Sequence, residues 1–499
     1  MYYRVKYIIG TLIIGKRERF NVIVTNDFQC DVCGKITKIR VQLGWLENYP
    51  VRIKCNECYT SIFGNVSMNP HNGGFHIDLK NVTRYTGNVN PDFIIDVSGE
   101  LLTKKIRKYT NSVENLMSPF IKDGVSKMGI NTVGDFKSTI IGFLMSINHK
   151  WPTVKRINEL WLSQNDKYLR DELHKILNKT VYPADNQWEL LRAVHAVNIN
   201  FTGPISKVTF FKSTEFIFSQ LKKIQDQEQS HQQLIDLALH FQNQLNDFEE
   251  KIFIITNKFV EKFPMLIPVI GLEYYKDEDN KAKVMQEMGL TTVDFEDIKD
   301  FYIDTFEDLG DIFDLIVAFE NLIVRSDFKL MDPNINKPIK TLEDYSKMQK
   351  KGKKLEFIDA LDAFKYLFMS KVDSRLRNAI GHRSYKYDVN TQKIVYAPSG
   401  KMDKETLESI YLTEFTYGCL QLFRSCLAIG ELIYQTRKVI CVIEGSSVRT
   451  FDEYFPGSSI KANKVKDSLE KDKDKDIFKK KKRSKNIQKK SRKNNRRKK

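Results

Sequence analysis

The sequence lacks any long uninterrupted apolar run. Its longest apolar stretches, residues 7–15 and 264–272, fall far short of the roughly 18 residues that a membrane-spanning helix needs. The N-terminal apolar stretch is followed by the charged residues 16–19, without a small-residue cleavage site, so it does not read as a secretory signal. We therefore expect no membrane association and predict a soluble, cytoplasmic protein.

Several common catalytic motifs are also missing. The sequence has no Walker-type phosphate loop, no dinucleotide-binding glycine fingerprint, no His-Glu-x-x-His and no Gly-x-Ser-x-Gly. These absences argue against an NTPase, a dehydrogenase, a zinc protease and a serine hydrolase.

Cysteine is scarce, with seven residues in 499, but four of the seven form two tight pairs. Cys30-x2-Cys33 and Cys55-x2-Cys58 are separated by 21 residues, and in a chain without a secretory signal this spacing favours a metal over disulfides. Four thiolates suit tetrahedral zinc and leave no open position, so we predict a structural zinc site that resembles a zinc ribbon. Redox dithiols and unliganded core cysteines stay open as alternatives.

The remaining candidate ligands are expected to have ordinary roles. We interpret His71 as a loop residue and His76 as a strand residue rather than as further zinc ligands. Cys419 and Cys426 lie on one face of the same predicted helix and Cys441 follows in an apolar stretch, which favours small buried hydrophobic residues.

Acidic residues are almost absent from the end of the chain. The net charge is +17, but residues 461–499 hold 20 basic and 5 acidic residues, which leaves 60 basic and 58 acidic residues in the first 460. The body is nearly neutral, so attraction to a polyanion rests on the tail. Residues 479–499 contain 14 basic residues, no acidic residue and no aromatic residue, which predicts a disordered tail that binds phosphate backbones without base specificity. Nuclear import and simple solubilisation are competing interpretations. The cations assigned to RNA-backbone binding are Lys479, Lys480, Lys481, Lys482, Arg483, Arg492, Lys493, Arg496 and Arg497.

The apolar pattern changes period near residue 100. Before it, short alternating runs between glycine, asparagine and proline predict strands; after it, the spacing is helical. We predict an α+β multidomain chain: a small β-rich zinc-ribbon-like domain (1–99), a helical domain (100–239), a second helical domain with an inserted β-hairpin at 385–396 (240–445), and the basic tail (446–499). Helices are expected at 166–177, 186–197, 213–262, 295–326, 355–380 and 404–439, with turns at 151–152, 182–185 and 203–204.

One predicted helix ends in a charged motif. Apolar residues recur at steps of three and four along residues 361–380, and the segment Arg377-Asn378-Ala379-Ile380-Gly381-His382 closes the pattern. In a continuous helix Arg377 and His382 would point about 140° apart, since five residues turn through about 500°. We expect Gly381 to end the helix and let His382 swing back toward Arg377.

This segment resembles the HEPN superfamily of helical nucleotide-binding and ribonuclease domains. The family signature is an arginine, usually a polar residue next, and a histidine after four to six positions, and Arg377, Asn378 and His382 fit it over a resemblance that covers residues 240–445. The resemblance implies metal-independent RNA cleavage at a homodimer interface, with a 2′,3′-cyclic phosphate and a 5′-hydroxyl as products. His382 would move the proton, Arg377 would stabilise the phosphorane, and Asn378 would orient the phosphate or the imidazole.

Two functions follow from these observations. The first is an endoribonuclease of a toxin or phage-defence type, which implies RNA as substrate and a neutralising or sensing partner protein. Because some HEPN domains only bind or scaffold, the alternative is a non-catalytic zinc-ribbon adaptor that binds RNA or a protein.

An acidic segment precedes the motif. Residues 294–314 contain nine acidic residues and one lysine. The acids alternate with apolar residues at helical spacing, which predicts a solvated helix face; a divalent-metal site and a dock for the basic tail are the alternatives.

Overall fold

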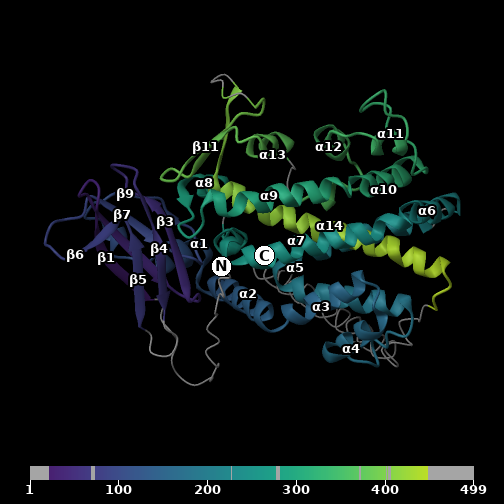
Figure 1. Cartoon of the computed structure of the whole chain (residues 1–499), viewed down its shortest axis with the longest axis horizontal. Helices are drawn as coiled ribbons and strands as arrows, with labels where there is room; N and C mark the ends of the chain where they lie inside the picture. The colour runs from purple at the N-terminus through teal and green to yellow at the C-terminus, as the bar shows by residue number, and fades with distance from the viewer. Residues whose placement is uncertain are drawn as a thin grey trace, which may run out of the picture.

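The structure, a computed structural model, joins a β-rich unit at one end to a helical body that forms the rest (Figure 1). It describes residues 22–68, 74–225, 228–276, 281–369, 373–400, 402 and 406–447. The α+β fold class is confirmed. The tail cations, His71 and the predicted strand residues before position 22 lie outside the described residues. None of the described helices combines the length and the apolar character needed to cross a membrane.

Two antiparallel hairpins begin the β-rich unit. Strand β1 (Val22–Cys30) pairs with β2 (Ile36–Leu43), and β3 (Asn48–Lys54) pairs with β4 (Ser61–Met68). The first hairpin lies in a five-stranded sheet of order β6-β1-β2-β7-β9, and the second lies in a three-stranded sheet of order β3-β4-β5. The other strands of the unit are β5 (Phe75–Lys80), β6 (Val82–Tyr85), β7 (Phe93–Val97), β8 (Thr103–Lys104) and β9 (Arg107–Lys108).

Strand β3 follows the expected alternation of buried and more exposed residues, whereas β2 is buried almost throughout and β7 throughout. In β3 the side chains of Tyr49, Val51 and Ile53 are buried while their neighbours are not. These residues belong to one apolar core that continues into the helical body. The last strand of the unit, β9, lies beyond residue 99, while the domain boundaries themselves stay a prediction.

One long helix, α14 (Leu412–Ile443), runs through the helical body and packs against α5, α7 and α9 (Figure 1). Its Phe423 ring stacks on Phe259 of α7, with ring centroids 3.5 Å apart. The other helices are α1 (Ser126–Met128), α2 (Ile130–His149), α3 (Trp151–Leu162), α4 (Asp166–Ile176), α5 (Gln187–Gln225), α6 (Glu228–Phe241), α7 (Leu245–Ile270), α8 (Lys281–Glu287), α9 (Phe295–Gly310), α10 (Phe313–Arg325), α11 (Leu342–Ser346), α12 (Lys351–Asp359) and α13 (Ser374–Gly381).

Two predicted helix breaks are wrong. Pro204 lies inside α5, and Pro264 lies inside α7, which continues to Ile270. The residues around both prolines are buried, including Phe201, Ile205 and Phe263. Burial of these large apolar side chains offsets the hydrogen bond that each proline removes.

The predicted single helix over residues 355–380 is also wrong, because it is interrupted between α12 and α13. Glu320 of α10 is buried, and its carboxylate accepts hydrogen bonds from the backbone amides of Asp362, Ala363 and Phe364 at 2.8–3.1 Å. These amides bond a buried carboxylate instead of helical carbonyls, so the chain turns here. The expected stripe along residues 361–380 therefore belongs to separate segments.

The predicted hairpin is confirmed as β11 (Tyr385–Asp388) and β12 (Lys393–Tyr396), and a third strand, β13 (Glu408–Tyr411), extends it. Its turn also contacts the rest of the chain. The Gln392 side chain exchanges two hydrogen bonds with the backbone of Leu290, directly after strand β10 (Met288–Gly289), which pairs with β8. The β-rich unit and the hairpin are thus joined through residues 288–290.

Candidate functional site

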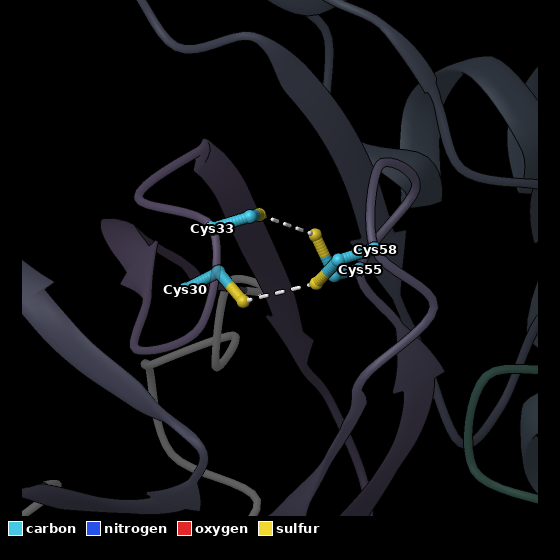
Figure 2. Close-up of side chains that lie close together, drawn as sticks. All are labelled: Cys30, Cys33, Cys55 and Cys58. Carbon is cyan, nitrogen blue, oxygen red and sulfur yellow. Dashed lines mark hydrogen bonds between the residues drawn. The ribbon is translucent and has the colours of Figure 1, made fainter.

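The four paired cysteines converge at the ends of the two N-terminal hairpins. Cys30 ends β1 and Cys55 directly follows β3, so each pair lies in the turn between two paired strands. Figure 2 shows the side chains pointing toward one another from these two turns. All four sulfur atoms lie within 4.8 Å of one another. The Sγ atoms of Cys30 and Cys58 are 3.6 Å apart, and those of Cys33 and Cys55 are 3.5 Å apart.

The two turns share one backbone geometry. The amide of the first cysteine donates to the carbonyl five residues later, from Cys30 to Lys35 and from Cys55 to Thr60. The residue after the second cysteine is left-handed in both turns, with φ 73° at Gly34 and φ 60° at Tyr59. Glycine takes this conformation readily, but tyrosine does so at a cost of about 1 kcal/mol or more. The sequence indicated the first turn through Gly34; the strained Tyr59 carries no such signal.

The cysteine cluster fits a tetrahedral metal ion. All four cysteines are free of disulfides, and a tetrahedral zinc with Zn–S bonds of about 2.3 Å requires sulfur atoms about 3.8 Å apart. Hydrogen bonding to Thr60 lowers the pKa of Cys58 to about 6, whereas burial raises the pKa of Cys33 to about 12 and also raises that of Cys55, so a metal would have to displace protons from these two thiols. Among the described residues this cluster alone could hold a metal ion.

The other expected cysteine and histidine roles agree with the structure. Cys419, Cys426 and Cys441 are buried in α14, and burial raises the pKa of Cys441 to about 11. His76 is an exposed residue of β5 and is not among the clustered ligands.

Helix α13 presents the predicted catalytic residues. Asp373 caps its first turn by accepting from the amides of Arg375 and Leu376 at 2.8 and 3.3 Å. Leu376, Ala379 and Ile380 are buried and fix one face of the helix on the body. Arg377 and Asn378 are partly exposed, and His382, directly after the helix, is exposed.

Helix α13 ends at Gly381, as expected, but Gly381 is not the left-handed residue. That conformation belongs to Arg383, with φ 56°. The amides of Arg383 and Ser384 donate to the carbonyls of Ile380 and Ala379, which is the Schellman arrangement with arginine in the place of glycine. The backbone of His382 (φ −89°, ψ 4°) departs from the helical conformation in ψ, and the swing of His382 toward Arg377 stays a prediction.

The Arg377 guanidinium interacts with side chains of its own chain. It forms an ion pair with Glu307 of α9, and its Nη1 donates to Asn378 Oδ1 at 3.1 Å. Its Nε is buried without a partner among the described residues. Within the described part of the chain no hydrogen bond joins Arg377 to His382. Sequence reasoning missed Glu307, although its acidic segment was a visible signal.

None of the nine acidic residues of the segment 294–314 is buried, which agrees with the predicted solvated helix face, but several of them also form ion pairs. Lysines from neighbouring helices pair with its carboxylates: Lys258 of α7 lies 2.8 Å from Asp304, Lys351 of α12 lies 2.7 Å from Asp311, and Lys354 of α12 lies 2.8 Å from Asp314. The segment therefore connects α9 and the start of α10 to α7, α12 and α13 through ion pairs. These lysines lie outside the acidic segment in the sequence, so the acidic pattern alone could not predict that they pair with it.

Further cations surround the end of α13. Arg375 is exposed and pairs with Glu408 of β13 at 2.7 Å. Arg383 and Lys386 are exposed and form no ion pair within the described ranges. The edge beside His382 is therefore open to solvent and carries positive charge that is not neutralised by direct contacts.

No protein-family model matches the chain, and no curated protein or solved structure is similar enough to count as a match. The functional assignment accordingly rests on the residues and their geometry.

Proposed function

We propose that this chain is a HEPN-type endoribonuclease that cleaves RNA without a catalytic metal through Arg377, Asn378 and His382. The observation that carries the proposal is that α13, fixed by one buried face, presents an exposed imidazole at its end and a guanidinium within the turn before it. An imidazole can move a proton near neutral pH, and a guanidinium is a permanent cation. RNA supplies its own nucleophile, so these two groups suffice.

The reaction needs no further group. Neutral His382 takes the proton of the 2′-hydroxyl, and the 2′-oxygen attacks the adjacent phosphorus. Arg377 stabilises the added negative charge of the phosphorane, and Asn378 orients it. The bond to the 5′-oxygen then breaks, and a protonated imidazole returns a proton to this oxygen. The products are a 2′,3′-cyclic phosphate and a 5′-hydroxyl.

Two copies of the chain are expected to complete one site. Since the backbone is helical through Gly381, the side chains of Arg377 and His382 leave the chain about 140° apart. A two-fold arrangement in which two α13 ends face each other would set Arg377 of one copy opposite His382 of the other. The active species we propose is therefore a homodimer.

Glu307 would compete with an RNA phosphate for Arg377 in this site. It occupies the Arg377 guanidinium in the free protein, so an RNA phosphate must replace it or share the guanidinium with it. Glu307 would keep Lys351, whose Nζ lies 3.1 Å from its carboxylate, when Arg377 turns to the phosphate.

The cysteine cluster is proposed to hold a structural zinc ion. Cys30, Cys33, Cys55 and Cys58 fill a tetrahedral shell and leave no position for substrate or water. The ion would join the hairpins of two different sheets and thereby stabilise the β-rich unit.

The basic tail is proposed to tether RNA. Its cations, with the exposed Arg383 and Lys386, would attract phosphates without reading bases. We place this activity in the cytoplasm, as a toxin or phage-defence effector controlled by a neutralising or sensing partner.

The proposal is tested by incubating the purified chain with RNA in the presence of EDTA and sequencing the ends produced. We expect cleavage with 2′,3′-cyclic phosphate ends, lost in His382→Ala and kept in Arg375→Ala, which removes a cation from the same helix. Cleavage that requires Mg²⁺, or that survives in His382→Ala, would overturn the proposal.

A non-catalytic adaptor is the second candidate, and exposed apolar residues on the two zinc turns favour it. Val32 is 68% exposed and Tyr59 is 62% exposed. Under this function His382→Ala would leave every RNA and protein interaction unchanged, whereas Val32→Asp would weaken capture of a protein partner.

A further inference from the structure

A cavity that shares no residue with either site described above lies in the helical body. It is formed by α5, α6, α10 and the end of α14 and has a volume of about 410 Å³, within the range of small-molecule sites. Its wall is mainly apolar and includes Leu221, Leu234, Ile235, Phe319, Val439 and Val442.

The apolar wall continues from the core to the surface. Leu221, Leu234 and Phe319 are buried, while Val442 is 55% exposed and Ile443 is 42% exposed. A long apolar molecule could therefore enter at the end of α14 and bury surface on both itself and the protein. This burial is favourable by roughly 25 cal/mol per Å².

Two hydrogen-bond donors line this wall without an acidic partner. The Trp188 indole is 8% exposed, and its Nε1 has no hydrogen-bond partner among the described residues. The Lys438 ammonium donates to Gln435 Oε1 at 3.0 Å and lies 5.3 Å from the centre of the Trp188 ring. It forms no ion pair within the described residues.

The nearest carboxylate is already in use. Gln435 donates to Glu431, and Glu431 is paired with His195 at 2.7 Å. Burial lowers the pKa of Lys438, although the charge of Glu431 acts in the opposite direction. A buried N–H without an acceptor and an ammonium without a counter-ion are both costly, and one carboxylate would satisfy both.

We propose that this cavity binds an amphipathic carboxylate, a free medium-chain fatty acid, with its acyl chain against the apolar wall and its carboxylate at Lys438 and Trp188. The other titratable lining residue is His231 of α6, and no acidic residue lines the cavity. The lining therefore favours an anionic head group over a neutral or a cationic one. This site is independent of the proposed ribonuclease activity.

Isothermal titration calorimetry on the full-length protein tests this with three probes of equal chain length: dodecanoate, dodecanol and dodecylammonium. We expect dodecanoate to bind at least about tenfold more tightly than dodecanol, because its carboxylate can form a charge-assisted hydrogen bond that the hydroxyl group of dodecanol cannot form. Dodecylammonium should bind most weakly. Equal affinities for the three probes, or no binding of dodecanoate, would overturn the proposal.

Two variants locate the head group. Lys438→Met keeps the length of the side chain and should remove the preference for dodecanoate over dodecanol while apolar binding remains. Trp188→Phe keeps a ring but removes the N–H and should weaken dodecanoate about threefold or more. Lys223→Met, on the exposed face of α5, is the matched control and should change nothing. An unchanged preference in Lys438→Met, in protein with a normal circular dichroism spectrum, would contradict the assignment.

Discussion

The cysteine cluster and the end of α13 are built in opposite ways. In the cluster, two turns of the same geometry direct four side chains inward, so one chain assembles the complete set of ligands. On α13, positions 377 and 382 leave one helix in different directions, and within the described part of the chain no hydrogen bond joins their side chains. The first site is closed and suits a structural ion; the second is open and suits a reaction completed by a second copy.

The largest expected effect comes from breaking the closed site. Cys55→Ser removes a buried ligand and should lower stability by more than about 3 kcal/mol, because metal binding supplies much of the folding free energy of such a unit. Metal analysis should show loss of the zinc, and hydrogen exchange should show unfolding of residues 22–108 before the helical body. The control is Cys441→Ala, which should cost about 1 to 2 kcal/mol without loss of metal. A metal-free wild-type protein of unchanged stability would contradict the zinc assignment.

The next largest effect is expected on the rate of RNA cleavage, with little change in the stability of the fold. His382→Ala should slow RNA cleavage at least about 100-fold, the usual contribution of a general acid–base group. Its free energy of unfolding should change by less than about 0.5 kcal/mol, because the side chain is exposed. Cleavage rates and urea unfolding curves check both values, and a destabilised His382→Ala protein would mean that the residue is structural.

A smaller effect is expected when Arg377 is released from its acidic partner. Glu307→Gln removes the charge that competes with phosphate, so RNA should bind about threefold more tightly at low salt. Asp304→Asn is the matched control, since it makes the same charge change on α9 but its partner is Lys258. Fluorescence anisotropy with labelled RNA measures both variants; equal responses would show a general charge effect and remove Glu307 from the site.

The smallest effect is a difference in stability between substitutions in the two turns of the cysteine cluster. Tyr59→Gly should stabilise the β-rich unit by about 1 kcal/mol because it relieves the left-handed strain, whereas Gly34→Ala should destabilise it by a similar amount. Thermal unfolding with bound zinc measures the difference. A loss of stability in Tyr59→Gly would show that the exposed ring contributes contacts that outweigh the strain.

The parts of the fold that depend on local patterns were predictable. Cysteine spacing identified the cluster, and alternation around residues 389–392 located the hairpin to its terminal residues. The helix breaks were predicted less well, because distant residues decide them: buried aromatic side chains keep Pro264 inside α7, and Glu320 interrupts the segment before α13.

The candidate active site shows the same limit. The motif located Arg377, Asn378 and His382 and the helix end at Gly381, but it did not show that the left-handed residue after the helix is Arg383. The contact with Glu307 depends on the packing of α9 against α13, which no local pattern contains.

The central claim is that Arg377 and His382 act together only across two copies of the chain, and subunit complementation tests it most directly. Arg377→Ala and His382→Ala proteins are prepared separately, shown to be inactive, and then dissociated, mixed and reassociated. Half of the mixed dimers should contain one of each, with one intact pair of residues, so activity should return to about a quarter of the wild-type rate. If the mixture stays inactive although mixed dimers form, each chain uses its own pair of residues and the account of the site is wrong.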